Sequence, residues 1–361
     1  MRSTERNLRK FPLVLALLSL VSYTLADTCS CGYAQGADVI WTDSIETDFT
    51  AVRDIETFQD WAVQKWTSAR NVSEAPYGRL REARNVVANP ATGGDGSIGK
   101  DGSQAGLQLY VRSALEDDNT LVPVGEIFSK REDIQYGSFR AGIQTSSING
   151  TVSAFFWYRN ATQEVDMELL SAETTANNST LNMVLQSWQS LWAGSDASKT
   201  AGFKKDVLPF IADDAVHEYR FDWTPTSVSF YVDSNHLWTN TLPDFVPSSP
   251  GYLVLNHWSN GNSGWSRGPP KEDARMIVTY VKAYFNSTDP VRQRDFSSAC
   301  RKPSSDNICQ ITPQAEPPIC RKPGGCEGGT MTVSSAASTG KVLSAILISI
   351  VGMAAVWLAG I

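Results

Sequence analysis

Residues 163–169 of this 361-residue chain read QEVDMEL, and this alternation of polar and apolar residues predicts a β-strand. Acids stand at every second position, at Glu164, Asp166 and Glu168. Successive side chains of a strand point to opposite faces, so the three carboxyls share one face and the valine and methionine between them share the other. Neighbouring carboxylates repel one another, which raises the pKa of at least one of them. One group is thereby prepared to donate a proton.

Aromatic side chains accompany this acidic segment. The stretch GTVSAFFWY (150–158) precedes it, and Trp188, Trp258 and Trp265 follow it. Pyranose rings have apolar C–H faces that suit aromatic surfaces, and glycoside hydrolysis uses paired carboxyls, so the combination favours a carbohydrate-active enzyme. Two plainer interpretations stay open at this point: an acidic strand face exposed to solvent, and aromatic residues that only pack in a core.

Short β-type runs separated by Gly, Asn, Asp and Ser extend from about Asp38 to Thr288 and predict an all-β sandwich or jelly roll. Further alternating runs lie at 106–112, 218–223, 228–232 and 276–285. The best helix candidate is 57–67. The Gly- and Ala-rich residues 89–106 are predicted to form a long loop, either a wall of a cleft or a surface excursion.

The segment 150–157 followed by Glu-x-Asp-x-Glu resembles the glycoside hydrolase family 16 enzymes, which include lichenases, laminarinases and fungal cell-wall transglycosylases. The similarity covers about residues 107–285 in consistent order. Its further segments are YGSFRA (136–141), HEYRFDWTP (217–225), FYVD (230–233) and LNHW (255–258) with Trp265 beyond it. The resemblance implies a concanavalin A-like β-jelly-roll of two curved antiparallel sheets, with a substrate cleft on the concave face.

By the same resemblance, Glu164 is expected to be the nucleophile, Glu168 the acid/base, and Asp166 the residue that holds the nucleophile in place. Residues i and i+4 of a flat strand are about 13 Å apart at Cα, whereas retaining enzymes hold the reacting carboxyls about 5 Å apart. Curvature and rotamer choice must therefore bring the carboxyls together. No extra residue interrupts the acidic triplet, so we expect a regular strand, as in the lichenase-like and transglycosylase-like branches.

The resemblance also implies six substrate-binding side chains, for which core packing is the plain alternative. They are Phe156 and Tyr158 before the acids, Gln186 and Trp188 on the strand after them, and Trp258 and Trp265 at the loop that closes the cleft.

The histidines His217, His236 and His257 lack the spacing of a serine-nucleophile triad or of a metal site. We therefore expect neither a cofactor nor a catalytic metal. Some family 16 members hold a calcium ion away from the active site, and the sequence does not decide whether this chain does.

The two ends predict export and anchoring. Residues 1–26 have a basic start and an apolar run ending in Thr-Leu-Ala, which indicates a cleaved signal peptide, with a signal anchor as the alternative. Residues 328–361 join small residues and a polar spacer to an uncharged end, typical of a GPI-attachment signal, with a transmembrane helix as the alternative. Between them we expect a jelly-roll domain (27–289) and a Cys/Pro-rich extension (290–327). These features predict a eukaryotic, fungal-type protein at the cell surface, GPI-anchored to the plasma membrane or wall.

Charge and cysteine content agree with that location. The formal net charge is −7. Loss of residues 1–26 removes four basic and one acidic residue and loss of the tail removes Lys341, so the mature charge is about −11. Nucleic acid is a poor partner for such a chain, whereas a neutral polysaccharide suits it. We expect a monomer that contacts the membrane only through its anchor.

Six cysteines in an exported chain predict disulfides, and their fifteen pairings stay open. None lies between residues 32 and 299, so the bridges should staple the edges of the domain. Glycosylation motifs are predicted at six asparagines. These are Asn71, Asn149, Asn160, Asn177, Asn178 and Asn286.

Three functions therefore compete. The first is a retaining hydrolase of β-1,3- or mixed β-1,3/1,4-glucan, and the second is a wall transglycosylase that passes glucan or chitin chains to β-glucan. Anchorage favours the second, because an enzyme fixed to its own surface acts mostly on its own wall. The third is a non-catalytic lectin or adhesin, which is expected to have lost one of the two glutamates.

Overall fold

The computed structural model describes residues 29–73, 75–93 and 96–311. The predicted signal peptide, the GPI-attachment segment, and Cys320 and Cys326 lie outside these residues.

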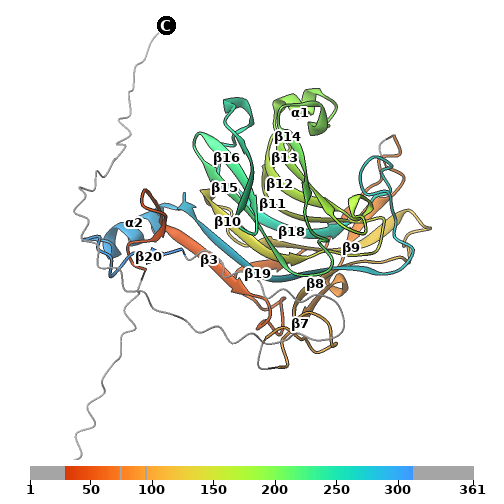
Figure 1. The fold of residues 1–361 in the computed structure, drawn as a ribbon, viewed down its shortest axis with the longest axis horizontal. Helices are drawn as coiled ribbons and strands as arrows, with labels where there is room; N and C mark the ends of the chain where they lie inside the picture. Colours follow the sequence, from red (N-terminus) through yellow and green to blue (C-terminus); the bar gives the residue numbers. More distant parts are fainter. Residues whose placement is uncertain (1–28, 74, 94–95, 312–361) are drawn as a thin grey trace, which may run out of the picture. The chain divides into compact units, whose positions relative to one another are not determined.

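Two curved β-layers pack face to face, and the layer that carries the acids is antiparallel throughout (Figure 1). Its strand order is β4 (Trp61–Val63), β9 (Leu121–Ser129), β18 (Tyr252–Trp258), β11 (Val152–Asn160), β12 (Gln163–Leu170), β13 (Ser179–Gln186) and β14 (Phe203–Leu208). The acidic strand β12 therefore lies inside the layer, with a partner on each side.

The second layer supplies the other wall of the core. Its order is β17 (Asn235–Asn240), β16 (Ser227–Val232), β15 (His217–Thr224), β10 (Ile134–Gln144) and β19 (Ala274–Ser287). One half of β19 then pairs with β3 (Asp43–Asp48) and the other with β8 (Gly106–Val111), which carries β7 (Val86–Asn89).

The core lies between the layers. Val165 and Met167 point into it from β12 and are fully buried. The indole rings of Trp157 and Trp223, one from each layer, have centroids 4.4 Å apart. Burial of this apolar face leaves the acids on the outer face of their layer, as the alternation predicts. The predicted jelly roll of two curved sheets is confirmed.

Strand β9 belongs to both layers and joins them. Its first half pairs in parallel with β6 (Gly78–Arg81), which is preceded by β5 (Thr67–Ser68), and its second half pairs with β18. Gly125 stands at the crossing, where a Cβ would lie 2.4 Å from the carbonyl oxygen of Asn85. Only glycine permits so close a backbone approach.

The predicted strands at 106–112, 163–169, 218–223, 228–232 and 276–285 are confirmed as β8, β12, β15, β16 and β19. The predicted helix at 57–67 is wrong, because this segment contains β4 and begins β5. Trp61 is fully buried, its indole donates to the hydroxyl of Thr47 at 3.0 Å, and β4 pairs with β9. Strand pairing with a distant segment has overridden the local helical pattern.

Helices are short and lie at the ends of strands. They are α1 (Trp188–Trp192), α2 (Pro290–Ala299) and the 3-10 turns η1 (Ala83–Asn85), η2 (Ser171–Glu173), η3 (Ala197–Lys199) and η4 (Pro243–Phe245). Helix α2 was missed from sequence, although Asp289 caps it and Pro290 opens it, a combination that marks a helix start. No helix in the described part of the chain is both long and apolar enough to span a membrane.

The loop between β7 and β8 packs on the second layer. Its Asp101 accepts hydrogen bonds from Asn89 and Gln108 and pairs with Arg275 of β19. A cavity lies beside Glu168, and none of the described residues of this loop lines it. Of the two alternatives for this segment, the surface excursion agrees with these contacts.

The predicted glycosylation sites lie on the surface. Asn71, Asn149, Asn160 and Asn177 are exposed, and Asn178 and Asn286 are partly exposed. An oligosaccharide can therefore be accommodated at the four exposed positions, and glycosylation stays a prediction.

Two disulfides tie the start of the described chain to the segment after β19. Cys29 bonds to Cys309 and Cys31 to Cys300, and the segment they clasp forms a small sheet of β2 (Val39–Trp41), β1 (Tyr33–Gln35) and β20 (Cys309–Gln310). The expectation that bridges staple the edges of the domain is confirmed.

The two bridges should be partly redundant. Their sequence separations are 280 and 269 residues, so either one alone closes nearly the same loop. Replacing one cysteine pair by alanine should cost little stability, because the other pair still restricts the unfolded chain. Replacing both should lower the free energy of unfolding by about 4 kcal/mol. Urea unfolding of the three variants tests this, and a full-sized loss from one pair alone would contradict it.

Candidate active site

The three acids stand side by side on a regular strand. Pairing of β12 with β11 runs from Leu170 to Glu164 without a register shift, which confirms the unbulged strand. Asp166 is 6% exposed, and Glu164 and Glu168 are partly exposed. Each acid has a neighbour on β13 in the same row: Gln186 beside Glu164, Val184 beside Asp166 and Asn182 beside Glu168.

Burial raises the pKa of all three carboxyls, and the charge of Glu168 also raises the pKa of the other two. Burial raises the pKa of Asp166 well above its usual value, and the charges of Glu164 and Glu168 raise it further. A side-chain hydrogen bond joins Asp166 and Glu164, and this bond raises the pKa of Asp166 and opposes the rise that burial causes in the pKa of Glu164. The charge of Glu168 also raises the pKa of Glu164.

Two indoles contact Glu168. Trp265 Nε1 donates to Glu168 Oε2 at 2.9 Å, and Trp258 also hydrogen-bonds to this carboxyl. Burial raises the pKa of Glu168, and these hydrogen bonds and the charge of Arg79 reduce the rise. Glu168 therefore retains its proton at a higher pH than an ordinary glutamate, as a proton donor near neutral pH requires.

Arg79, on β6, is the cation that acts on both glutamates. Its positive charge lowers the pKa of Glu164 and of Glu168. The guanidinium carbon lies 4.9 Å from the ring centroid of Trp258. Burial lowers the pKa of Arg79 to about 10, so it stays cationic at neutral pH. Sequence reasoning missed this residue, which lies in a part of the chain that carries little of the family pattern.

A buried ion pair adjoins the acids on the β9 side. Arg81 Nε lies 2.5 Å from Glu126 Oε1, and Asn256 Nδ2 donates to Glu126 Oε2 at 2.9 Å. Glu126, Asn256, Ala154 and Glu168 stand opposite one another on successive strands. The small Ala154 leaves space in this row between Asn256 and Glu168. The Oδ1 of Asn256 is buried without a partner among the described residues, so it can accept a hydrogen bond from a ligand.

The predicted binding residues separate into three groups. Phe156 and Tyr158 share the outer face of the layer with the acids and stand opposite Asp166 and Glu164. Gln186, Trp258 and Trp265 line a cavity of about 670 Å³ together with Glu168.

Trp188 does not join them. It was placed on the strand after the acids, but β13 ends at Gln186, and Trp188 begins α1. It does not line the cavity and is 57% exposed. The hydrogen bond between the N-cap Ser187 and Ser190 starts the helix here and turns the chain away from the sheet.

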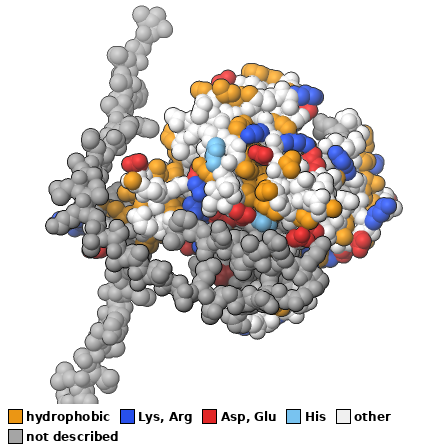
Figure 2. Space-filling view, in the orientation of Figure 1, with side chains coloured by type: hydrophobic (Ala, Val, Ile, Leu, Met, Phe, Trp, Pro, Cys, Tyr) orange, Lys and Arg blue, Asp and Glu red, His pale blue; other side chains and the backbone are white. Residues whose placement is uncertain are grey.

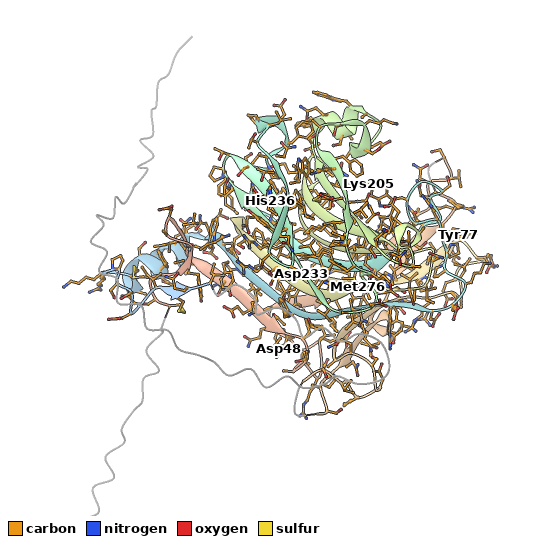
Figure 3. All side chains as sticks on the ribbon, in the orientation of Figure 1. Asp48, Tyr77, Lys205, Asp233, His236 and Met276 are labelled. Carbon is orange, nitrogen blue, oxygen red and sulfur yellow. A yellow bond between two sulfur atoms is a disulfide. The ribbon has the colours of Figure 1, made fainter. Side chains whose placement is uncertain are left out.

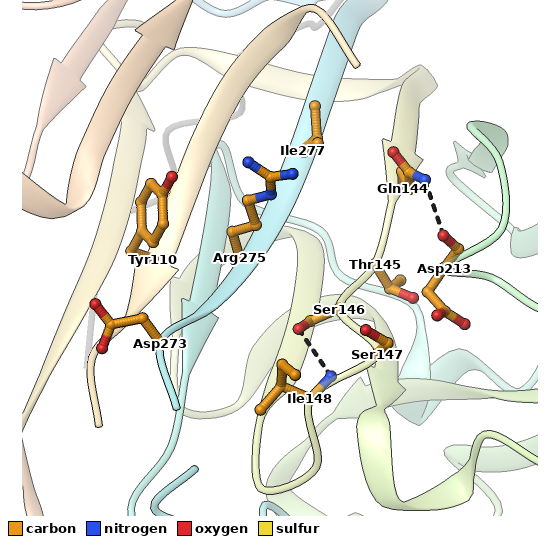
Figure 4. Close-up of a pocket in the computed structure, with 10 residues that line it drawn as sticks. All are labelled: Tyr110, Gln144, Thr145, Ser146, Ser147, Ile148, Asp213, Asp273, Arg275 and Ile277. Carbon is orange, nitrogen blue, oxygen red and sulfur yellow. Dashed lines mark hydrogen bonds between the residues drawn. The ribbon is translucent and has the colours of Figure 1, made fainter. Parts of the chain in front are cut away.

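A second cavity, of about 340 Å³, lies away from the acids (Figure 4). Tyr110 and Arg275 line one side of it, and Gln144 and Asp213 line the other. Of its two carboxylates, Asp273 is paired with Arg112 and accepts a hydrogen bond from the backbone N–H of Ser113. We therefore place the candidate active site at the cavity beside Glu168.

His217 and His257 make structural contacts. His217 stacks on Phe210 with 3.5 Å between ring centroids and bonds to Asp233. His257 is buried, its Nδ1 contacts the carbonyl oxygen of Leu109 at 2.9 Å, and burial lowers its pKa to about 4. Within the described ranges, no group of three or more His, Cys, Asp or Glu side chains is arranged to hold a metal ion.

Comparison with known proteins identifies a matching family and several similar proteins. Residues 93–280 match the sequence model of glycosyl hydrolases family 16. The β-glucanase of Bacillus amyloliquefaciens is 31% identical over 136 residues, which cover 36% of this chain and 51% of that protein. The β-glucanase of Fibrobacter succinogenes is 30% identical over 165 residues, covering 42% and 44%. The chain thus spans about half the length of these curated relatives.

Among solved structures, a β-1,3-1,4-glucanase (lichenase) derived from a mouse hindgut metagenome aligns with a TM-score of 0.49 and 18% identity. The alignment covers 67% of this chain and 98% of that one.

Proposed function

Since the chain belongs to glycosyl hydrolase family 16, we propose that it cleaves β-glucan with retention of configuration, with Glu164 as nucleophile and Glu168 as acid/base. The substrate class we propose is β-1,3- or mixed β-1,3/1,4-glucan. One observation carries the proposal: two partly exposed glutamates share one strand face, where Glu168 accepts a hydrogen bond from the indole of Trp265 and Glu164 is hydrogen-bonded to Asp166.

In the first step, the proton of Glu168 passes to the glycosidic oxygen while the Glu164 carboxylate attacks the anomeric carbon. The bond to the leaving chain breaks, and a covalent glycosyl ester forms on Glu164. In the second step, Glu168, now ionised, takes a proton from an incoming hydroxyl, whose oxygen attacks the anomeric carbon and displaces Glu164. Two inversions give net retention. Asp166 supports the cycle by donating to Glu164 whenever that carboxylate is ionised.

The incoming hydroxyl decides between hydrolysis and transfer. Water gives a shorter glucan, whereas a sugar gives a transglycosylation product. The cavity beside Glu168 supports transfer as a second activity, because about 670 Å³ on the proton-donor side is room for an acceptor sugar once the leaving chain has departed. Glucan or chitin chains are the acceptors and donors we propose for this second activity.

We further propose that the protein works outside the cell, on a fungal-type surface, where a GPI anchor holds it beside its own wall. Two disulfides in the described residues support an oxidising compartment.

Product analysis tests these proposals. The purified full chain is incubated with laminarin, lichenan and chitin oligomers, with and without a fluorescent oligosaccharide acceptor, and the products are sized. Short unlabelled products would establish hydrolysis and identify the linkage. Label in long chains would establish transfer. No change in any polymer would refute the enzyme and favour a glycan-binding protein.

The charge of Arg79 should set the pH range of activity. Arg79→Met removes a cation that lowers the pKa of both glutamates, so both pKa values should rise. Ionisation of the nucleophile then requires a higher pH, and the acid keeps its proton to a higher pH. We expect both limbs of the kcat/KM profile on lichenan to move upward by on the order of one pH unit. Arg53→Met, at an exposed position, is the control, and a downward shift would contradict the argument.

A further inference from the structure

Helix α1 exposes an unusual amount of apolar surface. Trp192 is 76% exposed, Trp188 57% and Leu191 38%. The two indole centroids are 6.3 Å apart, with their planes inclined by 31°. In the space-filling view, hydrophobic side chains are exposed along the upper edge of the molecule (Figure 2), at which Figure 1 places α1. Neither indole contributes to the core, so core packing does not account for them.

The helix is held in place despite its exposure. Ser187 and Ser190 form a reciprocal capping box at its start. Gln189 Nε2 donates to Asp244 Oδ2 at 2.8 Å, which ties α1 to the turn η4. A ligand that binds the two rings therefore meets a surface that is already ordered, and the entropic cost of binding is reduced.

The segments that flank α1 on both sides line the cavity beside Glu168. Gln186, two residues before the helix, lines that cavity, and so does the segment from Gly194 to Lys199 after it. Lys205, labelled in Figure 3, lines it from the neighbouring strand β14. Helix α1 thus lies between two segments that line the cavity.

The cavity lies on the side of the acid/base. Glu168 lines it, whereas Glu164 and Asp166 do not. A general acid protonates the oxygen of the leaving chain, and the acceptor enters along the same path in the reverse direction. A chain that lies in the cavity is therefore the acceptor, and one that continues past Gln186 reaches α1.

We propose that Trp192 and Trp188 form a platform on which an acceptor β-glucan chain lies, outside the cavity and in line with it. This inference rests on the proposed transglycosylase activity. Neutral pyranose rings suit the site, because their apolar faces stack on indoles and their hydroxyls stay in water. The platform raises the occupancy of the acceptor next to the glycosyl ester, so a sugar hydroxyl reaches the ester in place of water.

The test compares Trp192→Ala and Trp188→Ala/Trp192→Ala with the unaltered full chain. Val291→Ala, at an exposed apolar position on α2, is the matched control, and Trp192→Tyr is the conservative variant. Labelled laminari-oligosaccharide is titrated as acceptor, and transfer and hydrolysis products are counted separately. For the double variant we expect the half-saturating acceptor concentration to rise about tenfold. The ratio of transfer to hydrolysis should fall with it, and the tyrosine variant should recover most of the loss.

Equal loss of transfer and hydrolysis would overturn the platform, since it would indicate damage to the fold. An unchanged acceptor dependence would overturn it too, as would hydrolysis without transfer in the unaltered chain.

If no polymer is turned over, the proposed function fails, and direct titration of laminari-oligosaccharides into the same variants decides the platform separately. Weaker binding by the double variant would support it, and equal binding would refute it. Sedimentation identifies the rival occupant, because a dimer that the double variant abolishes would assign this surface to a second copy of the chain.

Discussion

Glu164→Gln is expected to lower kcat/KM on β-glucan by on the order of 10⁴-fold or more. Glutamine keeps the size of the side chain but cannot form the glycosyl ester as a carboxylate does. The residual rate is then what substrate positioning and proton donation by Glu168 supply. Binding of glucan should persist, because the aromatic and polar side chains on the same face are unchanged.

The measurement pairs initial rates on lichenan and laminarin with binding of the same oligosaccharides by calorimetry. Unfolding monitored between pH 5 and pH 8 controls for folding. Burial raises the pKa of Glu164, so the native carboxyl binds more protons than the unfolded one, and its ionisation destabilises the fold as pH rises. The amide does not titrate, so the variant should gain stability relative to the parent towards pH 8. Full activity in this variant would refute the assignment of the nucleophile.

Glu168→Ala is expected to have a second, different effect. On natural glucan, loss of the proton donor should lower the rate by about 10²- to 10⁴-fold. A dinitrophenyl glycoside needs no protonation to leave, so the first step should survive and the glycosyl ester on Glu164 should accumulate. Azide, which attacks without a general base, should then restore turnover and yield a β-glycosyl azide.

Intact-protein mass spectrometry detects the ester as an added sugar mass, and peptide mapping should locate it on the peptide that contains Glu164. Glu132→Gln, at an exposed position, is the control and should accumulate no ester. Formation of the β-glycosyl azide by Glu164→Ala, with only the α-azide from Glu168→Ala, would show that the two roles are reversed.

Part of the site was predictable because it is local. The alternation around Glu164 and Glu168 places both carboxyls on one face and their apolar neighbours in the core, and neither assignment needs knowledge of distant residues. The same period of two identified β12 in one layer and β8, β15, β16 and β19 in the other. Where local pattern and long-range pairing disagreed, pairing prevailed: Trp61 joined β9 as a strand, although its segment has a helical pattern.

The charge environment of the acids was not predictable. Arg79 reaches them from β6, and Glu126 and Asn256 come from β9 and β18, so their approach depends on strand order. Trp188 was predicted from the sequence to line the cleft. The N-cap residue Ser187 instead starts a helix at this point, so Trp188 does not lie on the sheet.

By itself, the sequence determined the fold class, the family resemblance and the pair of glutamates, because alternation and motif spacing are properties of neighbouring residues. Only the tertiary structure decided which cysteines pair, which cation tunes the carboxyls and which indoles face solvent. These outcomes depend on distances between strands that are far apart along the chain, and such distances are set when the layers close on their shared core.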